Sequence, residues 1–224
     1  RLERGAEGWI LHDETGTRLF SGDTTEWSAS FYAAITDRVY KHAVEKVYEW
    51  HHATDGVLHP KGHVITMLER MAGGKRLDVT PALTPDRDCG VIASRQDDAL
   101  YLLVYRHTTG REAEPEQIFT VTVDAQGLDA DGLTEWTVDA TRAAWARTFD
   151  ADCRAAGVAP LPKAGRYEGG IEKAYGRRGL PVWRANRDRY AALSVLPQTQ
   201  QTTVNAADGK LTLTTAMPSH TVRL

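Results

Sequence analysis

The chain has 224 residues, of which 42% are hydrophobic and 25% charged, a composition that allows a sizeable globular core. Its formal net charge is −3 and no stripe of Lys and Arg runs through it, which argues against nucleic acid as the main partner. No apolar stretch approaches membrane-spanning length, so we expect no membrane partner. The sequence begins at Arg1 without an initiator methionine, and we therefore expect a chain that is processed, truncated or part of something longer.

The first third of the sequence alternates between the patterns of strands and helices. A β-favouring run at residues 18–27 leads to Ser30, an expected N-cap, after which apolar residues recur every four positions and predict a helix. Residues 46–50 form either a buried strand or the tail of this helix, and we favour the strand. A second amphipathic helix follows Pro60 and stops at a pair of glycines. This order predicts two βα units of a parallel sheet or barrel.

From about residue 81 the sequence changes to short strands separated by turn residues. Residues 118–124 alternate apolar and polar side chains, the pattern of a half-buried strand. Further strands are expected at residues 90–93, 99–105, 134–138, 210–216 and 221–224. Two helical stretches, residues 141–156 and 184–193, lie between them. We therefore predict an incomplete barrel part in residues 1–80 and a β-sandwich domain with a helical insertion in residues 81–224.

A group of four histidines raises the question of a metal site: His51, His52, His59 and His63. His59 and His63 have the i, i+4 spacing that can hold a metal on one face of a helix. Pro60 and Gly62 argue against a regular helix there, and no cysteine is nearby to complete a zinc set. We therefore expect loop or substrate-contacting histidines and neither a metal nor another cofactor.

The most suggestive acidic residue is Glu26, which stands beside Trp27 at the end of an expected strand and before a helix. Barrel glycosidases present a nucleophilic carboxylate in this way. A second Thr-Glu-Trp triplet, at residues 134–136, has no βα context, and we interpret Glu135 as structural. A retaining glycosidase needs two carboxyl groups about 5 Å apart, one as nucleophile and one as acid/base.

The order of these segments resembles glycoside hydrolase family 39, the β-xylosidase and α-L-iduronidase family. Residues 25–30, Thr-Glu-Trp-Ser-Ala-Ser, are similar to the nucleophile segment at the end of the family's seventh barrel strand. The similarity continues through most of the chain, in segments that match the last barrel helix and the sandwich that follows it: residues 56–63, 67–77, 93–95, 102–105, 138–145 and 217–224.

The resemblance implies a fold of the α/β plus all-β class, namely the C-terminal part of a (β/α)8 barrel followed by a β-sandwich. It implies an exo-acting, retaining O-glycosidase with Glu26 as nucleophile and a pentoside, such as a xyloside or arabinoside, as substrate. The residues that it places at the substrate are Trp27, Trp50, His51 and His52.

The chain departs from the family in its acid/base residue, which there is a Glu directly after an Asn. The two asparagines here precede Arg187 and Ala206, so that residue is missing. Glu49 is a poor substitute, because strand alternation points it away from Trp50. We therefore expect a further N-terminal barrel segment or chain to supply the acid/base, and a large exposed apolar surface within residues 19–71 where it docks.

Two other functions stay open on the sequence. One is a non-catalytic carbohydrate-binding or interaction module in which Glu26 is incidental. The other is a metal-dependent hydrolase that uses the histidine group, whose activity a chelator would remove.

Overall fold

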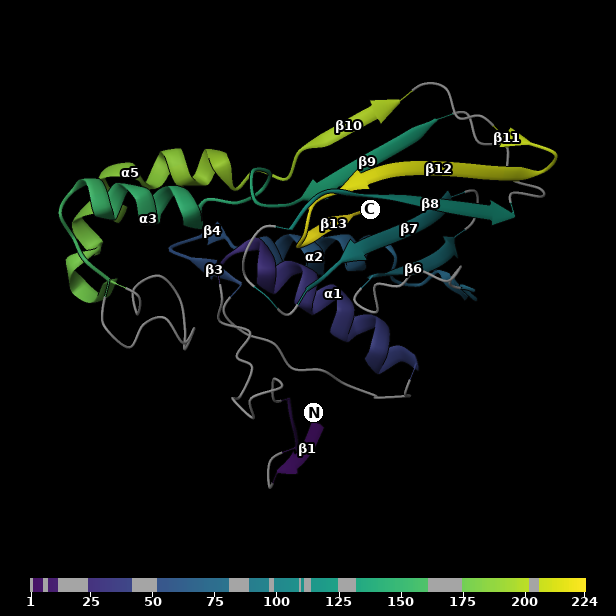
Figure 1. Ribbon diagram of the computed structural model, residues 1–224, viewed down its shortest axis with the longest axis horizontal. Coiled ribbons are helices and arrows are strands. Elements are labelled where there is room, and N and C mark those ends of the chain that lie inside the picture. The colour runs from purple at the N-terminus through teal and green to yellow at the C-terminus, as the bar shows by residue number, and fades with distance from the viewer. Residues whose placement is uncertain are drawn as a thin grey trace.

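A computed structural model describes the chain over residues 2–5, 8–11, 24–41, 52–80, 89–96, 99–108, 110, 114–124, 132–160, 175–201 and 206–224. It consists of helices and several antiparallel sheets (Figure 1). A short N-terminal hairpin pairs β1 (Leu2–Gly5) with β2 (Gly8–Leu11). Among the described residues no helix has the length and apolar character needed to cross a membrane.

The largest sheet has six strands, and each pair of neighbours is antiparallel. The order across the sheet is β10 (Gln198–Gln201), β9 (Leu133–Val138), β13 (Thr221–Arg223), β7 (Ala99–Arg106), β6 (Cys89–Gln96) and β5 (Lys75–Leu77). The C-terminal strand thus lies inside the sheet, where Val222 is opposite both Tyr105 and Val138. The strands predicted at residues 90–93, 99–105, 134–138 and 221–224 are confirmed.

A second sheet has three strands, β11 (Ala206–Ala207), β12 (Lys210–Met217) and β8 (Gln117–Asp124). β8 and β12 pair over eight residues each, from Gln117 opposite Met217 to Asp124 opposite Lys210. The predicted alternation in β8 is confirmed, because every second side chain from Phe119 is partly covered while the threonines between are exposed. The all-β half of the predicted fold class is therefore present as two antiparallel sheets.

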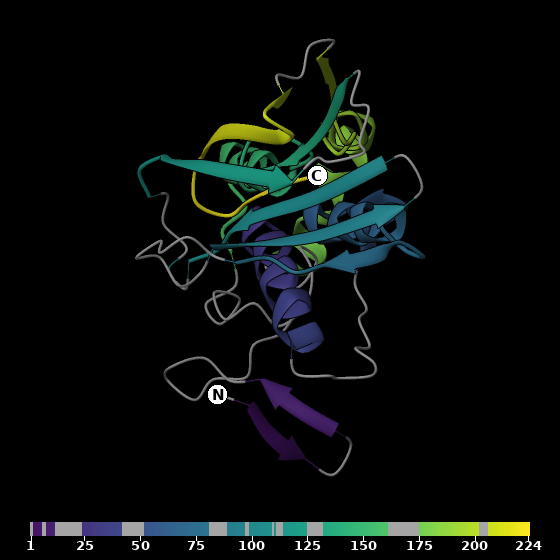
Figure 2. The same ribbon diagram turned by 90° about the vertical axis from the view of Figure 1, so that its right-hand side faces the viewer.

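Two helices of the N-terminal third, α1 (Glu26–Lys41) and α2 (Pro60–Arg70), pack against the six-stranded sheet (Figure 2). Small residues of α1, such as Ala29 and Ala33, are fully covered and allow close approach to the sheet. Met67 of α2 joins the same apolar core as Leu103 and Val222 from the sheet. These helices and the sheet therefore share one hydrophobic core.

This packing corrects the expectation of a large exposed apolar surface within residues 19–71. Among the described residues of that range, Tyr40 and Leu58 are the large hydrophobic side chains that remain exposed. The sheet covers the apolar faces for which we expected a docking segment. The proposed boundary at residue 80 stays a prediction, although β5, which precedes it, already belongs to the six-stranded sheet.

The two predicted helical stretches are confirmed as α3 (Ala146–Ala155) and α5 (Leu180–Leu193), with a short 3-10 turn, η2 (Gly176–Arg178), before α5. An aromatic core holds the two helices together: Trp145, Phe149, Tyr175, Trp183 and Tyr190. A hairpin of β3 (Ala53–Thr54) and β4 (Val57–Leu58) docks onto this core, where Trp145 Nε1 donates to the Leu58 carbonyl over 2.8 Å.

Two local expectations about the helices are wrong. α1 begins at Glu26, so Ser30 lies inside the helix, and residues 24–25 are not part of a strand. α2 includes both Pro60 and Gly62, which the sequence argument had placed outside a regular helix. Proline suits the first helical position because an N–H at that position would have no acceptor within the helix. Gly62 is required by space, since a Cβ would lie 2.9 Å from the His52 carbonyl oxygen.

Candidate functional site

Glu26 occupies the first turn of α1, where a carboxylate interacts favourably with the helix dipole. The residue is only 1% exposed. Arg147 of α3, distant in sequence, donates from Nε to Glu26 Oε1 over 2.9 Å and adds a second N–H from the same guanidinium. Glu26 Oε2 has no hydrogen-bond partner among the described residues. One carboxylate oxygen is therefore held firmly, while the other keeps its lone pairs.

The neighbouring aromatic residue, Trp27, is buried at 4% exposure. Its indole stacks on Phe31 with ring centroids 4.8 Å apart and meets His107 edge-on at 5.1 Å. In this arrangement the ring of Trp27 packs against side chains of the same protein. The predicted contact of Trp27 with substrate stays a prediction.

A buried polar cluster lies beside these rings, between α1 and the sheet. Ser30 Oγ is 2.9 Å from His107 Nδ1 and 3.4 Å from His220 Nδ1, and His220 Nε2 is 3.4 Å from Thr108 Oγ1. Burial lowers the pKa of His107 from 6.5 to about 3, and the nearby His220 and Arg38 add to the effect. At neutral pH His107 is therefore an uncharged hydrogen-bonding group.

No sequence pattern predicted this cluster, because its members lie far apart in the chain. His107 directly follows β7, and His220 directly precedes β13. The pairing of these two strands brings both rings to one end of the sheet, next to Ser30. In the sequence His107 follows one expected strand and His220 precedes another, and neither position indicates that the two residues meet.

His59 and His63 each contact a different hydroxyl group and do not share a ligand-like arrangement. His59 Nε2 lies 2.8 Å from Thr54 Oγ1, and His63 Nε2 lies 3.2 Å from Ser194 Oγ. Burial lowers the pKa of His63. In the part of the chain that the structure describes, no three His, Cys, Asp or Glu side chains are grouped as a metal site requires.

The predicted substrate contacts other than Trp27 are only partly described. His52 is half-buried next to the β3–β4 hairpin, and its carbonyl oxygen accepts the His59 N–H over 2.7 Å. Trp50 and His51 lie outside the described residues, as do residues 18–23 and 46–49 of the expected strands. Whether these side chains gather around Glu26 stays a prediction.

The second Thr-Glu-Trp triplet provides a contrast to the first. Glu135 lies in β9, accepts a hydrogen bond from Thr137 over 3.0 Å and pairs with Arg223 at 3.4 Å. Thr137 lies in β9 itself and Arg223 in the neighbouring strand β13, and both strands belong to the six-stranded sheet. This geometry agrees with the interpretation of Glu135 as structural.

No protein-family model matches the sequence, and no curated protein matches it. Among solved structures, a bacterial orthologue of human α-L-iduronidase has a similar fold, with a TM-score of 0.57 and 12% identity, over 91% of this chain and 38% of that chain. A GH39 enzyme from Xanthomonas axonopodis pv. citri aligns with a TM-score of 0.43 and 12% identity, over 75% of this chain and 30% of its own.

The likeness in fold to the iduronidase orthologue agrees with the resemblance to glycoside hydrolase family 39 inferred from the sequence, since α-L-iduronidase is one of the activities of that family. At 12% identity the likeness to the iduronidase orthologue concerns the fold. The chain spans 38% of that protein's length, and a partial barrel is not seen in the described residues.

Proposed function

We propose that this chain is the C-terminal part of an exo-acting, retaining glycosidase and that Glu26 is its nucleophile. The fold likeness to an α-L-iduronidase orthologue supports a glycosidase-like origin. The Thr-Glu-Trp-Ser sequence at residues 25–28 supports the choice of Glu26. The observation that carries the proposal is the asymmetric environment of the Glu26 carboxylate.

A nucleophilic carboxylate has to present one oxygen with free lone pairs in a fixed direction. The two N–H groups of Arg147 fix Oε1 of Glu26, and Oε2 has no hydrogen bond among the described residues. A carboxylate that served only as a structural ion pair would gain from bonding both oxygens. The arrangement therefore suits attack by Oε2 on an anomeric carbon.

In the proposed reaction, Glu26 forms an ester bond to the anomeric carbon while the glycosidic bond breaks and its oxygen takes a proton from the acid/base carboxyl group. Water then cleaves the ester and gives a proton back to that carboxylate. The acid/base must come from a further segment or chain, because the family's Asn-Glu pair is absent here. Since Glu26 is 1% exposed, we propose that the same segment also uncovers it for substrate.

A pentoside such as a xyloside or arabinoside is the proposed substrate. Trp27, Trp50, His51 and His52 form its proposed subsite, in which an aromatic face covers the apolar side of the sugar ring.

The experiment is Glu26→Gln in the complete protein, assayed with an aryl xyloside and an aryl arabinoside. We expect turnover to fall by at least roughly four orders of magnitude, as for removal of a covalent nucleophile, while sugar binding persists. Glu135→Gln is the matched control, since it makes the same change in a second Thr-Glu-Trp triplet, and it should retain turnover. Equal turnover in both variants would reject the proposal.

A second candidate is a non-catalytic carbohydrate-binding or interaction module. The nearly complete burial of Glu26 favours this alternative. It predicts that Glu26→Gln lowers stability and leaves any carbohydrate binding unchanged, with no turnover in either protein.

A further inference from the structure

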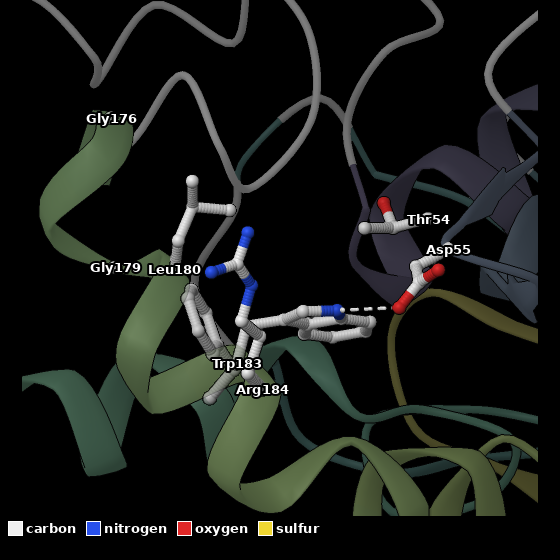
Figure 3. A pocket seen from close by; sticks show the side chains of 8 residues that line it. Thr54, Asp55, Gly176, Gly179, Leu180, Trp183 and Arg184 are labelled. Atoms are coloured by element: carbon white, nitrogen blue, oxygen red, sulfur yellow. Dashed lines mark hydrogen bonds between the residues drawn. The ribbon is translucent and has the colours of Figure 1, made fainter.

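A pocket of about 360 Å³ lies between the β3–β4 hairpin and the helical insertion, and no sequence motif pointed to it. Figure 3 shows its lining, to which the hairpin contributes Thr54 and Asp55 and α5 contributes Leu180, Trp183 and Arg184. Phe149 of α3 completes the apolar part of the lining. Ligand pockets in proteins span about 300–1,000 Å³, so this one suits a single small ring.

The pocket is preformed, because α5 clamps the tip of the hairpin. Asp55 and Gly56 form a two-residue turn with φ values of 47° and 76°, as in a type I′ hairpin. Arg187 donates to the Asp55 carboxylate over 3.2 Å and to its carbonyl over 2.9 Å. Trp183 Nε1 donates to the same carboxylate oxygen, Oδ2, over 3.4 Å, a bond that Figure 3 marks.

Two polar groups at the pocket keep unused hydrogen-bonding capacity. The bonds to the Asp55 carboxylate all go to Oδ2, and no described residue donates to Oδ1. The guanidinium of Arg184 is exposed and has no hydrogen-bond or ion-pair partner among the described residues. One acceptor and one set of donors thus face a lining whose other members are mostly apolar.

This combination defines the chemistry of a ligand. Asp55 and Asp188 both pair with Arg187, and the charges of these three residues and of Arg184 sum to zero, which favours a neutral molecule over an anion or a cation. Hydroxyl groups can donate to Asp55 Oδ1 and accept from Arg184. The C–H face of a ring can rest on Leu180 and on the edges of Phe149 and Trp183 that line the pocket. A neutral sugar ring has both features.

We infer that the pocket between the β3–β4 hairpin and α5 binds one neutral monosaccharide ring, hydrogen-bonded by Asp55 and Arg184. Glu26 does not line this pocket, so the inference does not depend on whether Glu26 takes part in cleavage. A single ring held by a few hydrogen bonds corresponds to a dissociation constant of roughly 1 mM.

The test is a titration of the ¹⁵N-labelled 224-residue chain with D-xylose and D-glucose, followed by two-dimensional NMR. We expect saturable shifts of the Trp183 indole N–H and of the Thr54 amide with at least one of the two sugars. Arg184→Ala should weaken binding roughly tenfold, because a charge-assisted hydrogen bond is lost. Arg177→Ala removes the same charge from an exposed position outside the pocket lining and should bind as the unmodified chain does.

Asp55→Asn guards against a variant that fails to fold, because Asn tolerates the positive φ of this turn and keeps the shape of the side chain. It should also weaken binding. D-glucuronate is titrated in the same way as a charged control. The inference would be overturned if neither neutral sugar gave a saturable shift, if the Arg184→Ala chain bound with equal affinity, or if D-glucuronate alone bound. Glu26→Gln should leave the titration unchanged, so that failure here and failure of the proposed nucleophile remain distinguishable.

Discussion

Ionisable side chains are buried between α1 and the six-stranded sheet, and each has specific partners. Asp37 is 2% exposed, accepts a hydrogen bond from Tyr105 over 2.8 Å and pairs with Lys41 and Arg76. His107 and Ser30 meet nearby. Because a buried charge or polar group is costly without a partner, these contacts fix how α1 sits on the sheet.

Protonation of His107 is expected to destabilise the fold in acid. Its pKa is about 3 in the folded chain, below the ordinary value of 6.5, mainly because of burial. The unfolded chain therefore binds the proton more readily, and the stabilising contribution is complete above pH 6.5 and is lost as the pH falls from 6.5 towards 3. We expect the free energy of unfolding, measured by urea denaturation, to fall in this window by up to about 1.4 kcal/mol per pH unit for this proton.

His107→Asn tests the assignment, since the amide of Asn can replace Nδ1 in the contact with Ser30 but does not titrate. The variant should show a shallower pH dependence, with the remainder due partly to His63, whose pKa is also lowered by burial. An identical slope in the variant would show that His107 is not the responsible group.

The ion pair of Glu26 with Arg147 leads to a prediction about stability. Arg147→Ala leaves a buried carboxylate without this partner, and we expect a loss of about 2 kcal/mol in the free energy of unfolding. The expected loss is moderate because the Arg147 side chain is 53% exposed, so that solvent screens the ion pair. Adding Glu26→Gln to Arg147→Ala should recover part of this loss, since an amide is cheaper to bury than a charge. A double variant less stable than Arg147→Ala alone would contradict the account.

At the level of elements, α1 and α2 show what a local pattern can and cannot predict. The stripe of Val64, Met67 and Met71 correctly predicted a helix with one buried face. The same stripe does not identify the surface that it packs on, because that depends on residues far away in the sequence. The family resemblance supplied a barrel as the partner, whereas in the described residues the stripe lies on the antiparallel sheet.

This shared core predicts that a defect in α2 destabilises the sheet. Met67→Ala removes a fully buried side chain and should lower the free energy of unfolding by about 2–5 kcal/mol. Urea denaturation should show the shift in one transition, followed by circular dichroism and by tryptophan fluorescence. Glu69→Ala, an exposed change in the same helix, should stay within about 0.5 kcal/mol of the unmodified chain. A separate early transition of Met67→Ala would indicate that the helices and the sheet unfold independently.

At the level of the whole molecule, sequence reasoning succeeded where periodicity is local and failed where distant segments meet. β8 and β12 were predicted within a residue, because their alternation directly reflects one covered and one exposed face. The contact of Glu26 with Arg147 and that of Ser30 with His107 join residues far apart in the sequence, and no spacing rule relates them. The start of α1 was misplaced because the strand-like run before it continued through Trp27 in the sequence pattern.

The share of the structural neighbour's length that this chain covers bears directly on the proposed function. The chain spans 38% of the iduronidase orthologue, so the larger part of that protein has no counterpart here. We propose that a further segment supplies the acid/base carboxyl group and opens the Glu26 site. In this proposal Glu26 forms the covalent bond to the sugar.

Covalent trapping tests this claim most directly. A 2-deoxy-2-fluoro pentosyl fluoride slows both steps of a retaining mechanism, while its good leaving group still allows the first step, so the glycosyl-enzyme accumulates. The complete protein would be treated with this reagent, digested, and sequenced by mass spectrometry, with Glu135→Gln as a control that should label normally. We predict one pentosyl ester per chain, on Glu26. An ester on any other carboxylate, or turnover of pentosides without a label on Glu26, would contradict it.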